Sequence, residues 1–566
     1  MDMRWNFKEQ PNPILVKTLS ESINVNSTLS SLLINRGIQN FEEARSFFRP
    51  SLDGLHDPFL MKDMRIAVDR LKKAIDLNQK ILIYGDYDVD GTTSVAMVYS
   101  FLSDYSDKLS FYVPDRYSEG YGVSKKGIAW AIEHEIDLII SLDCGIRALD
   151  RVQEAKDAGI DFIICDHHHP GAELPPAIAI LDPKQENCSY PYPELSGCGV
   201  GYKLLQGYSI EMDIPQERLF DYLDLVVVSI ASDIVQITGE NRILAHYGLK
   251  RLNSSPRAGI KALLDVSGSK GRQNISSIVF GIGPRINAAG RIDHAHRAID
   301  LLISTDHSES KSFAARVNER NTERKDYDQN ITREALEMIA NNSELKEAKT
   351  TVLYKDDWHK GVIGIVASRC IEKYFRPTVI LTESNEKATG SVRSVPGFDV
   401  YEAITKCEDL LEQYGGHTYA AGLTLDLANV EAFKDRFEEV VSGSITEELL
   451  IPQISVESEI SLEQVNYKFY NILKQMEPFG PGNRTPVFMA SKVFISHRPT
   501  IMKEKHVKMI LRQEGNSRGY QALGFDMAEK AEELDNGILF DILFTIQENE
   551  YMGVSSLVLH LKDIRL

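Results

Sequence analysis

Three aspartates at alternate positions follow a short apolar segment at residues 81–83. They are Asp86, Asp88 and Asp90, and Gly91 and a helix-like segment come directly after them. One such aspartate would be explained by a turn or a helix cap. Three carboxylates this close repel one another and are costly to desolvate unless a cation lies among them. We therefore expect this loop to bind a divalent metal ion.

Further candidate ligands follow other apolar segments of the chain. Asp143 comes after residues 138–141, the run Asp166-His167-His168-His169 comes after residues 162–165, and Asp233 ends another apolar run. Each aspartate alone could be a cap or a turn residue. Imidazole with carboxylate suits Mn²⁺, Fe²⁺ or Zn²⁺, and a majority of hard carboxylates favours Mn²⁺ or Mg²⁺.

The two sets together indicate a reaction class. Five aspartates (86, 88, 90, 143 and 233) and one histidine can hold two cations about 4 Å apart. Such a pair activates water and stabilises both the attacking and the leaving oxygen of a phosphoryl transfer. A second histidine beside it could bind the scissile phosphate or assist the leaving group. The predicted reaction is phosphoester hydrolysis.

Several arginines and polar residues lie in loops rich in glycine and alanine. An isolated arginine is usually part of a surface salt bridge, but in such loops the close approach of a phosphate backbone is the better explanation. The net charge of −19 argues against a general nucleic-acid coat, yet it allows a local basic channel. The candidates are Arg116, Arg285, Arg291, Asn318, Ser391 and Arg393.

The first half of the chain alternates strand-like and helix-like segments. This pattern predicts an α/β fold with a parallel sheet that carries helices on both faces. Functional residues of such folds gather at the carboxyl ends of the strands. The expected strands are residues 81–84, 109–113, 138–141, 162–165 and 179–181, and helices are expected at 125–135 and 148–158.

A chain of 566 residues is too long for one core. We expect a first lobe with its N-terminal segment at 1–300, a connecting helix at 301–346, a second α/β lobe at 347–448, and a small β-barrel at 449–566. The N-terminus has no apolar signal segment, and the six cysteines form no Cys-x-x-Cys pair. Reduced thiols and a cytoplasmic location are therefore expected.

The ordered motifs resemble those of the DHH phosphoesterase superfamily. DYDVDG at 86–91, LDCG around Asp143, DHH at 166–168 and ASD at 231–233 are similar to its motifs I to IV. GPRINAAGR at 283–291 and GGHTYAAG at 415–422 resemble the RecJ branch, which carries a DHH-associated domain. EPFGPGNRTPVF at 477–488 is similar to the start of the OB-fold of that branch.

This resemblance implies a 5′→3′ exonuclease of recombination and repair that releases mononucleotides from single-stranded DNA enclosed by two lobes. It implies one cation, Mn²⁺ or Mg²⁺, on Asp90, Asp143, His167 and Asp233. It places a second on Asp88 and Asp143, with Asp86 as a neighbour. His168 would lie over the scissile phosphate. Contacts to the strand and its 5′ phosphate would come from Arg116, Arg285 or Arg291, Asn318, Ser391, Arg393 and, in the second lobe, His417.

The resemblance also implies partners, namely single-strand-binding protein and a RecQ-type helicase. Two alternatives stay open. The first is a DHH phosphodiesterase for small substrates such as nanoRNA or cyclic dinucleotides, although such enzymes usually need only two lobes. The second is a non-catalytic replication scaffold, although every motif carboxylate is present together with His167 and His168.

Overall fold

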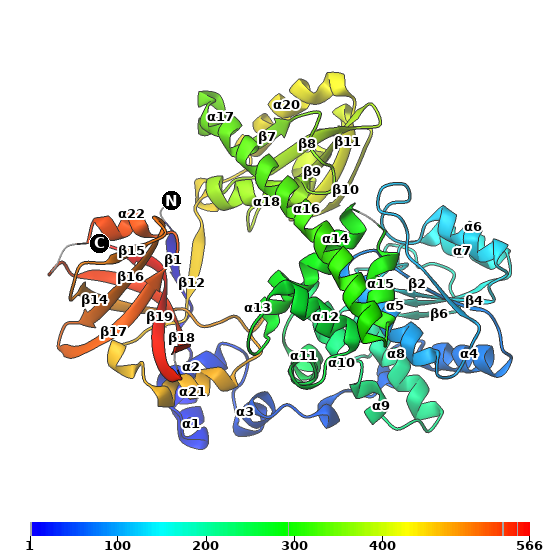
Figure 1. Ribbon diagram of the computed structural model, residues 1–566, viewed down its shortest axis with the longest axis horizontal. Coiled ribbons are helices and arrows are strands. Elements are labelled where there is room, and N and C mark those ends of the chain that lie inside the picture. The colour runs from blue at the N-terminus through cyan, green and yellow to red at the C-terminus, as the bar shows by residue number, and fades with distance from the viewer. Residues whose placement is uncertain (1–2, 293, 535–536, 552) are drawn as a thin grey trace.

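The computed structural model describes residues 3–292, 294–534, 537–551 and 553–566. Figure 1 shows two α/β lobes joined by a long helix, with a β-barrel set apart from both. No helix among these residues is both long and apolar enough to cross a membrane. The predicted fold class, with its parallel sheet, connecting helix, second α/β lobe and barrel, is confirmed.

The sheet of the first lobe has five parallel strands. Their order is β3 (Leu109–Tyr112), β2 (Ile81–Gly85), β4 (Leu138–Leu142), β5 (Asp161–Cys165) and β6 (Ala179–Leu181). The chain runs from β2 outward to β3 and then crosses back to β4 on the other side of β2. This reversal makes β2 and β4 neighbours, so their carboxyl ends flank the switch point at which open α/β sheets bind ligands.

Helices cover both faces of this sheet, so its strands are continuous apolar runs rather than alternating ones. Side chains such as Ile81 and Ile83 pack in the core on one face, and those of Leu82 and Tyr84 pack in the core on the other. The first core is formed with α4 (Met64–Asp76), α5 (Val89–Leu102), α8 (Gly197–Glu211), α10 (Leu223–Ser232) and α11 (Gly239–Ser254), and the second with α6 (Lys125–Glu133) and α7 (Leu149–Asp157).

The connecting helix α16 (His307–Ala340) begins at Asp306, whose side chain caps it. It is shorter than the predicted segment, because α15 (His296–Ile303) and α17 (Ser343–Glu347) are separate helices. It packs on α14 (Gly283–Ile292) of the first lobe and α18 (Ile363–Tyr374) of the second.

The second lobe is built on a five-stranded sheet. Its strand order is β10 (Gln413–His417), β11 (Ala420–Leu425), β9 (Lys387–Arg393), β8 (Thr378–Ser384) and β7 (Thr351–Tyr354). Helices α19 (Val400–Thr405) and α20 (Val430–Ser442) pack on this sheet.

The barrel is a seven-stranded sheet closed by a pairing of β14 with β16. Its strands are β13 (Ser458–Glu459), β14 (Phe488–Ile495), β15 (Thr500–Met502), β16 (His506–Gln513), β17 (Asn516–Gly524), β18 (Phe540–Tyr551) and β19 (Val554–Arg565). Helix α21 (Tyr467–Gln475) packs against its core.

The N-terminal segment packs on this barrel. Strand β1 (Arg4–Phe7) pairs in parallel with β12 (Gln453–Val456). Leucines of α1 (Pro13–Ile23) and α2 (Ser27–Ile34), with Ala44 of α3 (Phe41–Phe48), join the barrel core. We therefore propose a division in which residues 3–48 and 449–566 form one unit, here called the barrel arm, rather than one that keeps the N-terminal segment with the first lobe.

Candidate functional site

The loop after β2 gives its three aspartates different surroundings. Asp86 is fully buried at the end of the strand. Asp88 caps α5, its Oδ1 accepting a hydrogen bond from the Gly91 amide at 3.0 Å. Asp90 lies in the first turn and is 1% exposed. A Cβ at position 91 would lie 2.3 Å from the Asp86 carbonyl oxygen, so glycine is what lets α5 start this close to the strand.

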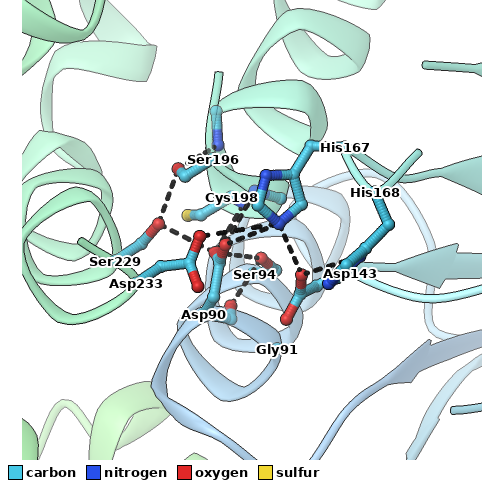
Figure 2. A network of polar contacts seen from close by, with 12 residues as sticks. Asp90, Gly91, Ser94, Asp143, His167, His168, Ser196, Cys198, Ser229 and Asp233 are labelled. Atoms are coloured by element: carbon cyan, nitrogen blue, oxygen red, sulfur yellow. Dashed lines mark hydrogen bonds and ion pairs between the residues drawn. The ribbon is translucent and has the colours of Figure 1, made fainter. Parts of the chain in front are cut away.

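The Asp90 carboxylate is held by two other helices. Its oxygens accept hydrogen bonds from the amides of Gly197 at 2.7 Å and Cys198 at 2.8 Å, which belong to the first turn of α8. Ser229 of α10 donates a third at 2.8 Å (Figure 2). A helix N-terminus and a hydroxyl group stabilise the negative charge and fix its orientation.

His167 lies between three of the predicted ligands. Its Nε2 is 3.1 Å from Asp143 Oδ1, 3.6 Å from Asp233 Oδ2 and 3.8 Å from Asp90 Oδ2 (Figure 2). Asp90, His167 and Asp233 form one close group of potential ligands, and Asp143 forms a second with His167 and His168, so His167 links the four residues predicted for the first cation. Asp88 and Asp86 join neither of the two close groups of potential ligands found among the described residues, so their assignment to a second cation stays a prediction.

The donor set and its electrostatics fit divalent cations. Burial raises the pKa of Asp86, Asp143 and Asp233, and the negative charges of neighbouring aspartates raise it further. Within the described chain, neither ring nitrogen of His167 is hydrogen-bonded, and neither is Asp86 Oδ2. Cations among these atoms would satisfy the orphaned groups and favour the ionised carboxylates.

Asp143 has an unusual backbone for a residue with a side chain. Its φ is 60°, in the left-handed region that aspartate tolerates better than most residues. A Cβ on Gly197 would lie 2.6 Å from the Asp143 Cβ, so the close approach of α8 requires glycine there. This predicted ligand thus has a strained backbone in a tightly packed place, as is common at functional sites.

His168 is oriented by Asp166, which belongs to the run of candidate ligands, and by Tyr121, which sequence reasoning missed. Its Nδ1 is 2.7 Å from Asp166 Oδ1, and its Nε2 is 3.2 Å from the Tyr121 hydroxyl. Burial disfavours the imidazolium, but the hydrogen bond and charge of Asp166 outweigh it and raise the pKa of His168 to about 9. The position of Asp166 directly after β5 was a signal for its role, whereas Tyr121 carried none.

A basic pocket of about 380 Å³ lies between the two lobes. Arg116 and Arg291 of the first lobe line it together with Ser391 and Arg393 of the second. Burial lowers the pKa of Arg291 to about 10, and the charges of Arg116, Arg324 and Arg393 add to this. Tyr87, between Asp86 and Asp88, also lines the pocket, so the pocket adjoins the acidic loop.

The other predicted strand contacts lie elsewhere. Arg285 is 6% exposed, and its Nε donates to Asn318 Oδ1 at 2.9 Å, so this pair ties α14 to α16. Of the two alternatives Arg285 and Arg291, the second lies in the pocket. His417 is exposed at the end of β10 and does not line it. Lys360 does line the pocket, and sequence reasoning missed it.

Protein-family models match three segments of the chain. The DHH family, N-terminal domain, matches residues 80–230, the DHHA1 domain matches residues 347–443, and the RecJ OB domain matches residues 456–563. The three segments fall in the first lobe, the second lobe and the barrel.

Curated relatives match almost the whole chain. The single-stranded-DNA-specific exonuclease RecJ of Bacillus subtilis is 36% identical over 99% of this chain and 70% of its own length. The protein of the same name from Salmonella typhimurium is 30% identical over 95% of both chains. Among solved structures, RecJ from Thermus thermophilus in complex with Mn²⁺ superposes with a TM-score of 0.85 at 26% identity, over 100% of this chain and 79% of that one. A structure of that protein with Mg²⁺ also matches.

Proposed function

The chain belongs to the RecJ family of single-stranded-DNA-specific exonucleases, and from this premise we propose how its two charged sites divide the work of the reaction. The protein is a single-stranded-DNA exonuclease of the DHH family whose cofactors are divalent cations, Mn²⁺ or Mg²⁺. We propose the polarity of its cleavage, its product and the role of each residue.

Asp90, Asp143, His167 and Asp233 hold one cation in this proposal, and Asp88 and Asp143 hold a second with Asp86 nearby. Bound divalent cations supply charge neutralisation at the phosphate and a water of lowered pKa. His168 holds a proton on Nε2 and donates it as a hydrogen bond to an oxygen of the scissile phosphate. Asp166 keeps the ring in that orientation through Nδ1, at 2.7 Å.

The basic pocket binds the 5′-terminal phosphate in this proposal. Arg116, Arg291 and Arg393 supply the positive charge, and Ser391 supplies a hydroxyl donor. The observation that carries the proposal is the proximity of the two sites: Tyr87 lines the pocket, and the residues on either side of it belong to the acidic loop. A strand anchored here by its 5′ end presents its first phosphodiester bonds to the acidic loop, which gives 5′→3′ polarity and mononucleotide products.

Degradation of end-labelled strands tests this proposal. The full chain is given long single strands that carry a 5′ phosphate or a 5′ hydroxyl and a label at either end, with Mn²⁺, Mg²⁺ or a chelator. We expect labelled mononucleotides at once from the 5′ label, a shrinking ladder from the 3′ label, a preference for the 5′ phosphate, and no cleavage with chelator. A ladder from the 5′ label would contradict the polarity.

Cleavage assays with the same full chain also test the two alternative functions. A phosphodiesterase for small substrates would prefer a dinucleotide to the long strand, and a scaffold would cleave neither with any cation. The barrel arm argues against the first, because phosphodiesterases for small substrates usually need only the two lobes. The buried aspartates argue against the second, since a cluster with raised pKa values is costly to keep without cations.

The expected partners and location rest on the family resemblance. We propose that single-strand-binding protein and a RecQ-type helicase deliver strands to this enzyme in the cytoplasm. A titration of the purified chain with each partner, followed by the rate of strand degradation, checks the first point. No change in rate and no complex would contradict it.

A further inference from the structure

The aspartates of the acidic centre differ in how they are held. Asp90 and Asp166 each accept several hydrogen bonds from backbone amides and side chains. Among the described residues, no donor is hydrogen-bonded to the carboxylate of Asp233, whose side chain is 28% exposed. The position of this ligand therefore depends on its backbone.

That backbone is the start of a short loop, residues 233–238, here called the ligand loop. Asp233 ends α10, its amide donating to the Ser229 carbonyl at 2.9 Å. The next residue, Ile234, has a φ of 60° and is 66% exposed. A β-branched residue in the left-handed region is strained, and it persists only where surrounding contacts impose it. Since Ile234 is largely exposed, the contacts that fix the loop lie farther along it, where the Gln236 carbonyl accepts hydrogen bonds from Asn241 Nδ2 at 3.0 Å and the Tyr192 hydroxyl at 3.2 Å.

The far end of the ligand loop is held by the barrel arm. The amide of Ile237 donates to the Pro481 carbonyl at 2.7 Å, and Ile237 is fully buried. A Cβ on Gly480 would lie 2.5 Å from Ile237 Cγ1, and one on Gly482 would lie 2.4 Å from Gln236 Oε1. Both glycines thus let residues 476–483, here called the joint loop, lie directly against the ligand loop.

The joint loop is itself firmly attached to the first lobe. Arg242 of α11 donates to the carbonyls of Met476 at 2.9 Å and Glu477 at 3.0 Å. It also donates to the Phe47 carbonyl at 3.0 Å, and its guanidinium stacks on that ring at 3.8 Å. Arg242 is 5% exposed, and its hydrogen bonds hold the segments around Phe47 and Met476 of the barrel arm against the catalytic lobe.

We propose that the joint loop positions Asp233, so that the barrel arm sets the affinity of the catalytic centre for divalent cations. This inference rests on the proposed role of Asp233 as a cation ligand. The physical reason is that Asp233 has a helix on one side and a strained segment on the other. The next anchor of that segment is the peptide group between Gln236 and Ile237, whose carbonyl accepts from Asn241 of the first lobe and whose amide donates to Pro481 of the barrel arm. A shift of that anchor moves a ligand whose carboxylate accepts no hydrogen bond from the described residues and whose backbone alone positions it.

A variant that introduces a clash and a second that removes it test the proposal. Gly480→Ala presses a methyl group on Ile237. Ile237→Ala added to it deletes Cγ1 and Cδ1 and leaves only Cβ, 3.6 Å away. The control is Gly519→Ala, which creates a close contact between β17 and β16 on the exposed face of the barrel, 2.8 Å from Ile510 Cγ2. Each full-length chain is titrated with Mn²⁺, and free Mn²⁺ is read from its electron paramagnetic resonance signal, so no nuclease assay is needed.

We expect Gly480→Ala to raise the dissociation constant for Mn²⁺ about fivefold. The double variant should return to within about twofold of the wild type, and Gly519→Ala should not differ from it. A folded Gly480→Ala chain with wild-type affinity would overturn the proposal, as would a loss that the double variant does not recover. If Gly480→Ala does not fold, Arg242→Lys replaces it, with weaker Mn²⁺ binding expected and unchanged binding contradicting the proposal. Wild-type protein that binds Mn²⁺ but degrades no strand would refute the proposed function and leave this inference standing.

Discussion

The acidic centre and the basic pocket are two concentrations of like charge with opposite signs. Burial raises the pKa of Asp143 in the first and lowers the pKa of Arg291 in the second, so each ionised group is disfavoured until a ligand of opposite charge arrives. The four residues predicted to hold the first cation all come from the first lobe. The arginines of the pocket come from both lobes, with Arg116 and Arg291 on one side and Arg393 on the other.

This difference indicates that the acidic centre carries out the cleavage and the basic pocket selects the strand. A site built within one lobe keeps its geometry when the lobes move. A pocket shared by two lobes exists only when they are together, so recognition of the strand end depends on their arrangement. Changes in the acidic centre should therefore abolish cleavage of every strand, and changes in the pocket should alter which strand is preferred.

The largest effect is expected from Asp143→Asn. Asparagine tolerates the left-handed backbone at this position, so the fold should remain, but one ligand charge is lost at the centre. We expect the rate of strand cleavage to fall about 10³-fold or more, for 5′-phosphoryl and 5′-hydroxyl strands alike. In chelator the variant should melt at a higher temperature than the wild type, because a repulsive charge is gone. Asp157→Asn, at an exposed aspartate of α7, is the control and should change neither quantity.

A smaller and selective effect is expected from Arg393→Ala. Loss of one charged donor to a phosphate is worth roughly 1.5–3 kcal/mol, which is about 10- to 100-fold. The ratio of kcat/KM for 5′-phosphoryl over 5′-hydroxyl strands should fall by that factor, while kcat/KM for the 5′-hydroxyl strand stays near the wild-type value. Arg436→Ala removes an arginine of α20 in the same lobe whose side chain is 44% exposed, and it serves as the control. An equal loss for both strands would place Arg393 in the chemistry rather than in recognition.

Asp166→Asn should separate two functions within the acidic centre, namely the support of His168 and the binding of cations. The asparagine oxygen can still accept a hydrogen bond, but the negative charge that supports the His168 imidazolium is removed. We expect kcat to fall about tenfold with little change in the dissociation constant for Mn²⁺. A large loss of Mn²⁺ affinity would instead show that Asp166 acts mainly through the cation ligands.

The smallest effect is expected from Asp182→Asn, measured as stability rather than activity. Burial raises the pKa of Asp182 to about 7, and the charge of Asp166 adds to this. The pKa of Asp182 is higher in the folded than in the unfolded wild-type chain. Its contribution to the stability of the fold is therefore complete below about pH 4 and is lost as the pH rises to about 7. The free energy of unfolding of the variant, relative to that of the wild type, should therefore rise by roughly 1–2 kcal/mol between pH 5 and pH 8. Urea unfolding in chelator at both pH values measures this, and a gain that is the same at both would contradict the assignment.

The sequence by itself determined the acidic centre and the architecture. Apolar runs followed by aspartates and histidines identified the strand ends, and parallel strands bring their carboxyl ends to one edge of a sheet. Asp90, Asp143 and His167 could therefore be predicted to meet, whereas Asp233 ends the helix α10 and was grouped with them by the family resemblance. The spacing of the motifs also separated two lobes, a connecting helix and a barrel.

Only the tertiary structure decided which arginine serves the pocket and where the N-terminal segment belongs. Arg285 and Arg291 have the same local sequence signals, but Arg285 is used to bond Asn318 and Arg291 faces the second lobe. Strand β1 pairs with β12, and Arg242 donates hydrogen bonds to the carbonyls of Phe47 and Met476. These contacts join residues that are hundreds of positions apart. Local patterns carry no information on such contacts, because they depend on how whole units pack rather than on the preferences of a few neighbouring residues.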